Sequence, residues 1–257
     1  MKKRALQLDR VSNGSSDRHF ADIILFIFLL SQSAFKVLFE LSACQVLDLL
    51  FAVNIPATLP DWISVKNFIK SFITSFLPIG YQQVRIAFVT YDYYQAYVQF
   101  GLSQNDSEDE VKLAIDRILF VPASFANPVW AMQAARQTIF RGTARPGVQQ
   151  VLVLIMLNSP PSISNAEQEA GLLASANIRT ITVDVGGVVG MTYLQLLASQ
   201  SSDVIASANY TVLSTQAQTL SDVMCKPVPK QGMSSDSLSS DEGCSNFLSE
   251  ECLLQEL

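Results

Sequence analysis

A polar, proline-broken loop follows directly on a continuous apolar run near residue 50. The run is Asp48-Leu49-Leu50-Phe51-Ala52-Val53 and the loop is Asn54-Ile55-Pro56-Ala57-Thr58. Ligands of an open parallel sheet bind outside the carboxyl ends of its strands. The side-chain oxygens of Asn54 and Thr58 are groups that can ligate a hard cation or orient a polar partner. The sequence therefore predicts the functional edge of the domain at Asn54 to Thr58.

Few other residues offer catalytic chemistry. The only histidine is His19, near the amino terminus, so the predicted folded region can hold neither a histidine-based zinc site nor a Ser-His-Asp triad. The glycine stretch 186–190 lacks the spacing of a phosphate-binding loop and has no following lysine, so we interpret it as a turn. The formal charge of −6 and the pI near 4.8 give no reason to expect nucleic-acid binding, since the sequence shows no basic patch that would bind a phosphate backbone.

The chain has four cysteines, and none of them has the spacing of a metal-binding pair. Cys44 lies just before the first apolar run and Cys225 just after the last periodic segment. A disulfide between Cys44 and Cys225 would tie both ends of one domain together, and two free buried thiols are the alternative. Cys244 and Cys252 lie in a Ser- and Glu-rich tail, where their pairing stays open.

The elements that must position these residues alternate between strand-length apolar runs and segments of helical period. The predicted strands are 48–53, 84–90, 91–100, 151–157, 179–185 and a short edge strand within 204–211. The predicted helices are 61–76, 108–119, 129–140, 165–176, 191–198 and 215–224. This order predicts an α/β fold, a doubly wound and mostly parallel sheet with one antiparallel edge strand and helices on both faces.

The two ends of the chain differ from the middle. Basic residues, a short apolar core at 21–30 and small residues at 31–34 are typical of a secretory signal within a leader of residues 1–43. A buried or amphipathic helix and an uncleaved anchor are the alternatives, and no stable membrane span is expected. The domain is predicted over residues 44–225, followed by a disordered Ser- and acid-rich tail at 226–257. Sequons at Asn105 and Asn209 fit a secreted chain.

Several phrases in this order resemble the von Willebrand factor type A domain, most closely those of collagen VI α chains, the α4-like chain and dual-A-domain proteins included, and of matrilins. The resemblance covers about Cys44 to Cys225. The phrases that carry it are Asp48–Val53, Val84–Tyr91, Ala131–Ala135, Val151–Ile155 and Ile181–Gly186.

This resemblance implies a metal-ion-dependent adhesion site built from three loops, with Asp-x-Ser-x-Ser, a Thr and an Asp as ligands. Here the corresponding positions carry other residues, namely Asn54, Pro56, Thr58, Ala126 and Leu157. Both carboxylates are missing, so we predict a degenerate site, no metal and no cofactor. A rearranged site that uses Asp61, Asn127 or Asn158 is the alternative.

The sequence thus favours a non-enzymatic protein-interaction domain that is secreted and resembles extracellular-matrix members, with a matrix protein as partner. The tyrosines Tyr91, Tyr93, Tyr94 and Tyr97 fit either a recognition surface or buried hairpin pairs. An α/β enzyme of unknown type and a degraded, functionless copy of a matrix protein are the alternatives, as is a cytoplasmic location. The enzyme is disfavoured because the edge loops offer no evident base or nucleophile.

Overall fold

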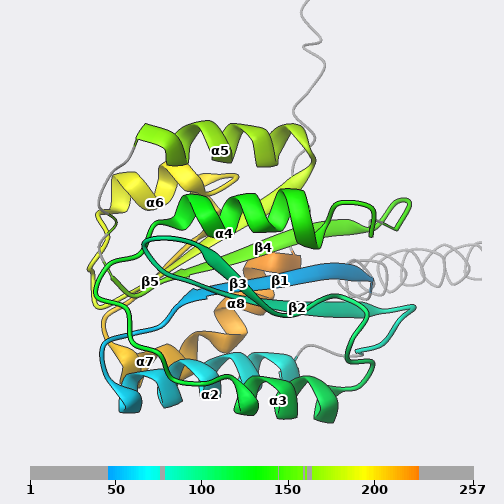
Figure 1. The fold of residues 1–257 in the computed structure, drawn as a ribbon, viewed down its shortest axis with the longest axis horizontal. Coiled ribbons are helices and arrows are strands. Elements are labelled where there is room, and N and C mark those ends of the chain that lie inside the picture. Colours follow the sequence, from blue (N-terminus) through cyan, green and yellow to red (C-terminus); the bar gives the residue numbers. More distant parts are fainter. Residues whose placement is uncertain (1–45, 76–78, 144, 159, 161–163, 226–257) are drawn as a thin grey trace, which may run out of the picture. The chain divides into compact units, whose positions relative to one another are not determined.

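A computed structural model describes residues 46–75, 79–143, 145–158, 160 and 164–225. Over these residues the chain forms a six-stranded sheet of order β3-β2-β1-β4-β5-β6, with β3 antiparallel to β2 and the other pairs parallel (Figure 1). The strands are β1 Leu47–Asn54, β2 Val84–Tyr91, β3 Ala96–Phe100, β4 Gln149–Met156, β5 Ile178–Val185 and β6 Val204–Ser207. The predicted fold class is confirmed.

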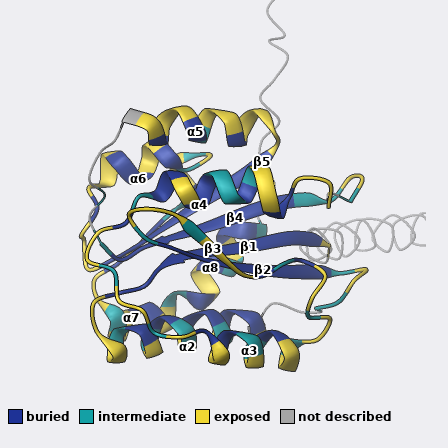
Figure 2. Ribbon diagram, viewed as in Figure 1, coloured by how far each residue is buried: buried dark blue, intermediate teal, exposed yellow. Residues whose placement is uncertain are grey.

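Helices cover both faces of the sheet (Figure 1). One layer holds α2 Leu59–Ser75, α3 Glu108–Arg117, α7 Tyr210–Leu213 and α8 Ala217–Cys225; the other holds α4 Pro128–Ala134, α5 Ser164–Ser175 and α6 Met191–Leu197. Short helical turns lie at Ala135–Ile139, Ser201–Asp203 and Ser214–Gln216. Figure 2 shows the strands buried between these layers and the outer helix faces exposed.

Successive side chains of the central strands point to opposite faces of the sheet and contribute to two apolar cores. In β1, Phe51 and Val53 join the core under α2, whereas Leu50 and Ala52 join the core under α4 and α6. Every residue of β1 is buried, as expected for the centre of a parallel sheet. The sheet therefore holds its edge loops on a rigid two-sided core.

Helix α2 is fixed by an apolar stripe of helical spacing. Its side chains Trp62, Val65, Phe68, Ile69, Phe72 and Ile73 are all at most 1% exposed. The Phe72 ring meets Phe51 of β1 edge to face at a centroid distance of 5.6 Å. Each such side chain stabilises the fold by about 1.5–3 kcal/mol on burial.

The predicted second hairpin strand begins too early. Strand β3 starts at Ala96, and residues 92–95 form a turn in which the Asp92 carboxylate accepts hydrogen bonds from the backbone N–H groups of Tyr94 (2.7 Å) and Gln95 (2.9 Å). This local bonding competes with the strand ladder. Tyr93 therefore lies in an exposed turn and not on a strand face.

Buried ion pairs hold the amino-terminal edge of the sheet. Asp48 accepts from Arg85 Nε at 2.8 Å and from Arg145 Nη2 at 2.6 Å. Arg179, the second residue of β5, pairs with Asp203 Oδ1 at 2.7 Å and also donates to the backbone oxygens of Val223 and Met224. Arg179 thus joins the end of α8 to this edge of the sheet.

Several predictions fall on residues outside the described ranges: the leader with its candidate signal, Cys44 and the tail. Cys225 is disulfide-bonded, and its predicted pairing with Cys44 stays a prediction. Within the described ranges, no helix is both long and apolar enough to cross a membrane.

Candidate functional site

The carboxyl ends of β1 and β4 bring two predicted site residues into contact. Asn54 is fully buried, and its Oδ1 accepts a hydrogen bond from the backbone N–H of Leu157 at 2.7 Å. This bond fixes the orientation of the amide, since the reversed amide would place two donors together. Asn54 Nδ2 is buried and has no hydrogen-bond partner within the described residues. The side chain thus presents an N–H donor, and not an oxygen, to the space beside it.

Three further predicted positions offer no ligand oxygen. The Leu157 side chain is 3% exposed and packs into the apolar core under α2. Ala126 is buried in the opposite core, and Pro56 is buried in the loop after β1. These side chains fill space that is closed to solvent.

Thr58 carries the one hydroxyl of the set, and that hydroxyl caps the amino terminus of helix α2. Thr58 Oγ1 donates to Asp61 Oδ2 at 2.6 Å and accepts from the Asp61 backbone N–H at 3.3 Å. The Thr58 backbone oxygen accepts from Trp62 N at 3.1 Å, as a helix-capping residue does.

The alternative ligands Asn127 and Asn158 are also engaged. Asn127 Oδ1 caps α4 by accepting from Val129 N at 3.1 Å. Asn158 Nδ2 donates to the backbone oxygen of Ala123 at 2.7 Å and, at 3.4 Å, to that of Ile55. Asn158 therefore ties the loop after β4 to the loop before α4. No group of three or more His, Cys, Asp or Glu side chains that could hold a metal occurs in the described part of the chain.

A buried carboxyl occupies the glycine turn after β5. Asp184 Oδ1 accepts from Val189 N at 3.3 Å, and the backbone around Gly186 and Gly187 has positive φ angles of 84° and 66°. Burial raises the pKa of Asp184, against the opposing effect of backbone N–H groups that include those of Val189 and Gly187. The N–H groups of this turn thus bond to the chain's own carboxyl group, which would repel a phosphate.

Tyr210 interacts electrostatically with two acidic residues of this edge, Asp61 and Asp184. Burial, with smaller contributions from the negative charges of Asp61 and Asp184, raises the pKa of the Tyr210 hydroxyl to about 12. The phenol stays protonated at neutral pH, so it cannot act there as a base.

Next to these closed loops, the molecule exposes a set of aromatic and aliphatic side chains. They come from the β2–β3 turn, from β3, from the segment between α3 and α4 and from the first turn of α4, and they are large: Leu119 is 77% exposed, Tyr94 76% and Phe125 62%. We call this set the aromatic face, and its members are Tyr93, Tyr94, Tyr97, Leu119, Val121, Phe125 and Trp130. Soluble proteins rarely expose so many large apolar groups together unless a partner covers them.

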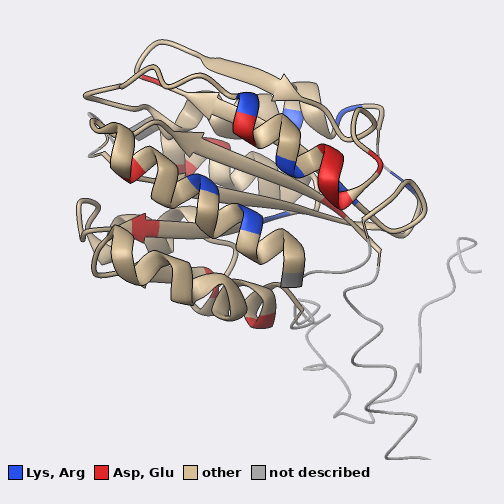
Figure 3. Ribbon diagram, turned by 90° about the horizontal axis from the view of Figure 1, so that it is seen from below, with Lys and Arg blue, Asp and Glu red and all other residues tan. Residues whose placement is uncertain are grey.

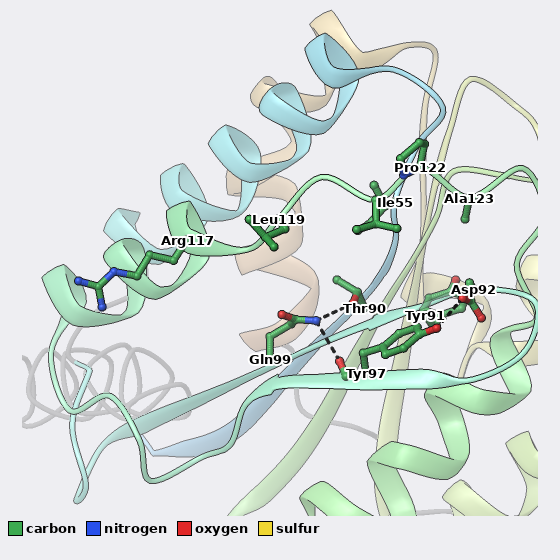
Figure 4. A pocket seen from close by; sticks show the side chains of 11 residues that line it. Ile55, Thr90, Tyr91, Asp92, Tyr97, Gln99, Arg117, Leu119, Pro122 and Ala123 are labelled. Atoms are coloured by element: carbon green, nitrogen blue, oxygen red, sulfur yellow. Dashed lines mark hydrogen bonds between the residues drawn. The ribbon is translucent and has the colours of Figure 1, made fainter.

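Two hollows lie within the aromatic face. The first, the edge groove, has a volume of about 360 Å³ and runs between β3 and the segment after α3, where Leu119, Ile55 and Gln99 line it (Figure 4). Gln99 Nε2 donates to Thr90 Oγ1 at 2.8 Å, which holds these two lining side chains of the groove in place. The second, the turn pocket, has a volume of about 390 Å³ and is lined by Asp92, Tyr93, Tyr94, Pro122, Ala123, Ser124 and Phe125.

Charged residues lie along the neighbouring helices α2 and α3 (Figure 3), and an ion pair joins the two helices. Lys70 binds Asp116 at 2.8 Å, and Lys66 donates to the backbone oxygens of Asp116 and Ile118. Burial lowers the pKa of Lys66, although Asp116 opposes this effect. Lys66, Lys70 and Asp116 of this surface are therefore bonded within the chain.

The sequence prediction named the tyrosines of this face but missed Leu119, Val121, Phe125 and Trp130. Their signal was available, since Leu119, Val121 and Phe125 fall on a proline-containing connection between two helices, and Trp130 follows at the start of α4. The sequence prediction assigned two of them, Leu119 and Trp130, to the helices 108–119 and 129–140. The first helix ends at Arg117, and Ile118 is already extended with ψ of 122°.

Both sequons lie on the surface ahead of helices. Asn105 is half-buried in the β3–α3 connection, and the third residue of its sequon, Ser107, caps α3. Asn209 is exposed, and its Oδ1 accepts from Val212 N at 3.0 Å at the start of α7. Neither asparagine lines the edge groove or the turn pocket.

Comparison with known proteins agrees with this architecture. A proximal thread matrix protein from the mussel byssus has a TM-score of 0.65 and 22% sequence identity, covering 71% of this chain and 47% of that one. A structure of the same mussel protein with a zinc-occupied MIDAS motif gives 0.65 and 24%, with coverages of 71% and 46%. Manganese-loaded TRAP protein from Plasmodium vivax gives 0.56 and 15%, with coverages of 68% and 74%.

These identities establish a shared fold, and this chain spans about half the length of the mussel structures. Among curated proteins, no significant match was found. A family model described as von Willebrand factor type A domain matches residues 48–223, which is more than half of the sequence. The chain belongs to the von Willebrand factor type A domain family.

Proposed function

We propose that this chain is a non-enzymatic protein-interaction domain that binds its partner without a metal ion, through the aromatic face. Its family is one of interaction and adhesion modules. The observation that carries the proposal is the exposure of Leu119, Tyr94 and Phe125 around two hollows at one corner of a rigid sheet. Large apolar groups at such a corner supply binding energy when a partner excludes water from them.

The donor set at the three edge loops supports the metal-independent part of the proposal. Mg²⁺ gives up its water only to well-placed oxygens, usually including carboxylates. The Asn54 side-chain oxygen accepts a hydrogen bond from the Leu157 backbone, and the Thr58 hydroxyl donates one to Asp61, so neither group is free to bind a cation. The orphaned donor Asn54 Nδ2 would repel a cation. We therefore regard Asn54, Pro56, Thr58, Ala126 and Leu157 as a degenerate adhesion site.

The surroundings of this domain are part of the proposal. A resemblance to collagen VI and matrilin domains, surface sequons and a disulfide-bonded Cys225 favour a secreted chain with a matrix protein as partner. The mussel byssus protein, a matrix protein by its printed name, has the same fold.

Calorimetric titration tests whether the edge loops bind a divalent metal ion. The wild-type chain is expected to give no binding heat with Mg²⁺ or Mn²⁺ beyond dilution. Micromolar binding that disappears in Asn54→Ala would contradict a metal-free site.

Partner capture in EDTA tests the face. The tagged full chain is used as bait with medium and extract of cells that express it, beside the variants Tyr94→Ala and Leu119→Ser. The matched control is Tyr81→Ala, since Tyr81 is 59% exposed but lies before β2, at the opposite edge. We expect a protein that wild type and the control retain in EDTA and that both face variants lose. Retention by all variants, or loss in EDTA, would contradict the proposal.

A further inference from the structure

The turn pocket contains a carboxylate that is held in place by neutral donors. Asp92 Oδ1 accepts the N–H groups of Tyr94 at 2.7 Å and Gln95 at 2.9 Å, and Oδ2 accepts the Tyr97 hydroxyl at 2.9 Å. No lysine or arginine forms an ion pair with Asp92 within the described ranges. The negative charge is therefore oriented but not neutralised.

Three aromatic residues line the same pocket as Asp92. Tyr93, Tyr94 and Phe125 line the same pocket of about 390 Å³, and the first two rings meet edge to face at a centroid distance of 5.0 Å. The turn that carries them is fixed from α4, since Trp130 Nε1 donates to the Tyr93 backbone oxygen at 3.0 Å. A second bond, from Asn127 N to the Asp92 backbone oxygen, measures 3.1 Å. The pocket is therefore formed before any partner arrives.

A pocket that is lined by a carboxylate and by aromatic residues is an environment that a cationic side chain prefers. An apolar side chain would cover Asp92 without neutralising it, which costs free energy. A guanidinium group fits better than an ammonium group, because it stacks on rings and meets a carboxylate through two N–H groups. The net charge of −6 also attracts a basic partner at a distance.

Resting on the proposed function, we propose that the turn pocket binds an arginine side chain of the partner protein. Asp92 neutralises the guanidinium, and the rings of Tyr94 and Phe125 stack on it. The edge groove beside it then takes the apolar residues that flank this arginine.

A pair of peptides tests the charge directly. The ¹⁵N-labelled full chain is titrated with acetyl-Gly-Gly-Arg-Gly-Gly-amide and with the same peptide carrying citrulline, which has nearly the same shape but no charge. We expect the arginine peptide to shift the backbone signals of Tyr94 and Gln95 and the Trp130 indole signal, with saturation in the millimolar range. The citrulline peptide is expected to bind about tenfold more weakly.

Two variants separate the charge from the rings. Asp92→Asn keeps the acceptor for Tyr94 and Gln95, so it preserves the turn, and Tyr94→Leu keeps apolar bulk but removes a ring. Each is expected to weaken the arginine peptide by about five- to tenfold. Asp109→Asn, an exposed acid on α3, is expected to change nothing.

Equal affinity for the two peptides, shifts confined to other surfaces, or unchanged binding in Asp92→Asn would overturn the arginine pocket. Such a result beside a partner that Tyr94→Ala loses in EDTA would leave the proposed function standing with a different partner chemistry. A partner retained by Tyr94→Ala and Leu119→Ser would instead reject the interaction face itself.

Discussion

Asn54 shows how one side chain changes the chemistry of a loop without changing its position. Its backbone still ends β1, opposite Tyr91 of β2, but its amide oxygen serves the Leu157 backbone and its nitrogen has no hydrogen-bond partner within the described residues. The neighbouring Leu157 completes the apolar core beneath. At this scale, the side chains of the loops serve the fold, and the proposed function assigns binding to the exposed groups beside them.

Leu157→Asp tests this assignment. A carboxylate placed in an apolar core is expected to lower the free energy of unfolding by about 3–5 kcal/mol at neutral pH. Urea denaturation measures the loss, with Leu119→Asp, at a leucine that is 77% exposed, as the control. A variant that regains its stability when Mg²⁺ is added would show that the site is still competent to bind metal.

Asp184→Asn tests the buried carboxyl of the glycine turn. The pKa of Asp184 in the folded chain is raised above its ordinary value of 3.8, so its contribution to stability is fully present below that value and is lost as pH rises through the raised pKa. The free energy of unfolding of wild type, measured relative to that of the variant, is therefore expected to fall as pH rises from about 3.5 to about 7. Urea unfolding over this range checks it, with Asp109→Asn as a control; a difference that rises with pH would reverse the sign.

At the scale of elements, the closing helix depends on one buried ion pair. Arg179 of β5 and Asp203 are 4% and 0% exposed, and Arg179 also binds two carbonyl oxygens at the end of α8. The pair therefore joins a strand, a short turn and the last helix of the domain.

Asp203→Ala is expected to destabilise the chain by about 3–5 kcal/mol, because it leaves the Arg179 charge buried without its partner. The double variant Arg179→Met, Asp203→Leu should recover much of this loss. Thermal and urea unfolding measure both. The exposed pair of Lys70 and Asp116 gives a matched comparison, and Lys70→Ala is expected to cost at most about 1 kcal/mol. Similar costs at the two pairs would contradict the role given to Arg179.

Strands and helices could be predicted from the sequence because their apolar periods are regular, as in β1 and α2. The β2–β3 turn could not, since the side-chain acceptor Asp92 ends the strand within a run of residues that otherwise favour strand. The aromatic face could not either. Leu119 and Phe125 have the composition of core residues, and only the packing of α3 and α4 against the sheet determines that they stay outside.

At the scale of the molecule, the candidate glycans and the aromatic face lie apart. The β3–α3 connection that carries Asn105 follows the end of β3, at the amino-terminal edge of the parallel strands, and Asn209 follows β6 at the far side of the sheet from β3. Asn209 Oδ1 is used in capping α7, which leaves its Nδ2 as the atom a glycan would occupy.

Expression of a tagged chain in a secretory host tests these sites. Treatment with a glycosidase is expected to lower the apparent mass of the secreted protein, and Asn105→Gln and Asn209→Gln are each expected to remove one step of that shift. Asn209→Gln should in addition cost up to about 1 kcal/mol of stability through the weakened cap. A protein that stays in the cytosol without modification would contradict secretion and make the disulfide with Cys44 untenable.

Leu47 begins β1 at the amino-terminal edge, and the end of α8 is held at the same edge by Arg179. A mechanical pull on these two points enters and leaves the domain at one pole. Buried ion pairs of Asp48 and Arg179 lie at this pole, whereas the aromatic face lies beyond the carboxyl end of β2. A force applied at these two points would therefore be applied away from the proposed interaction face.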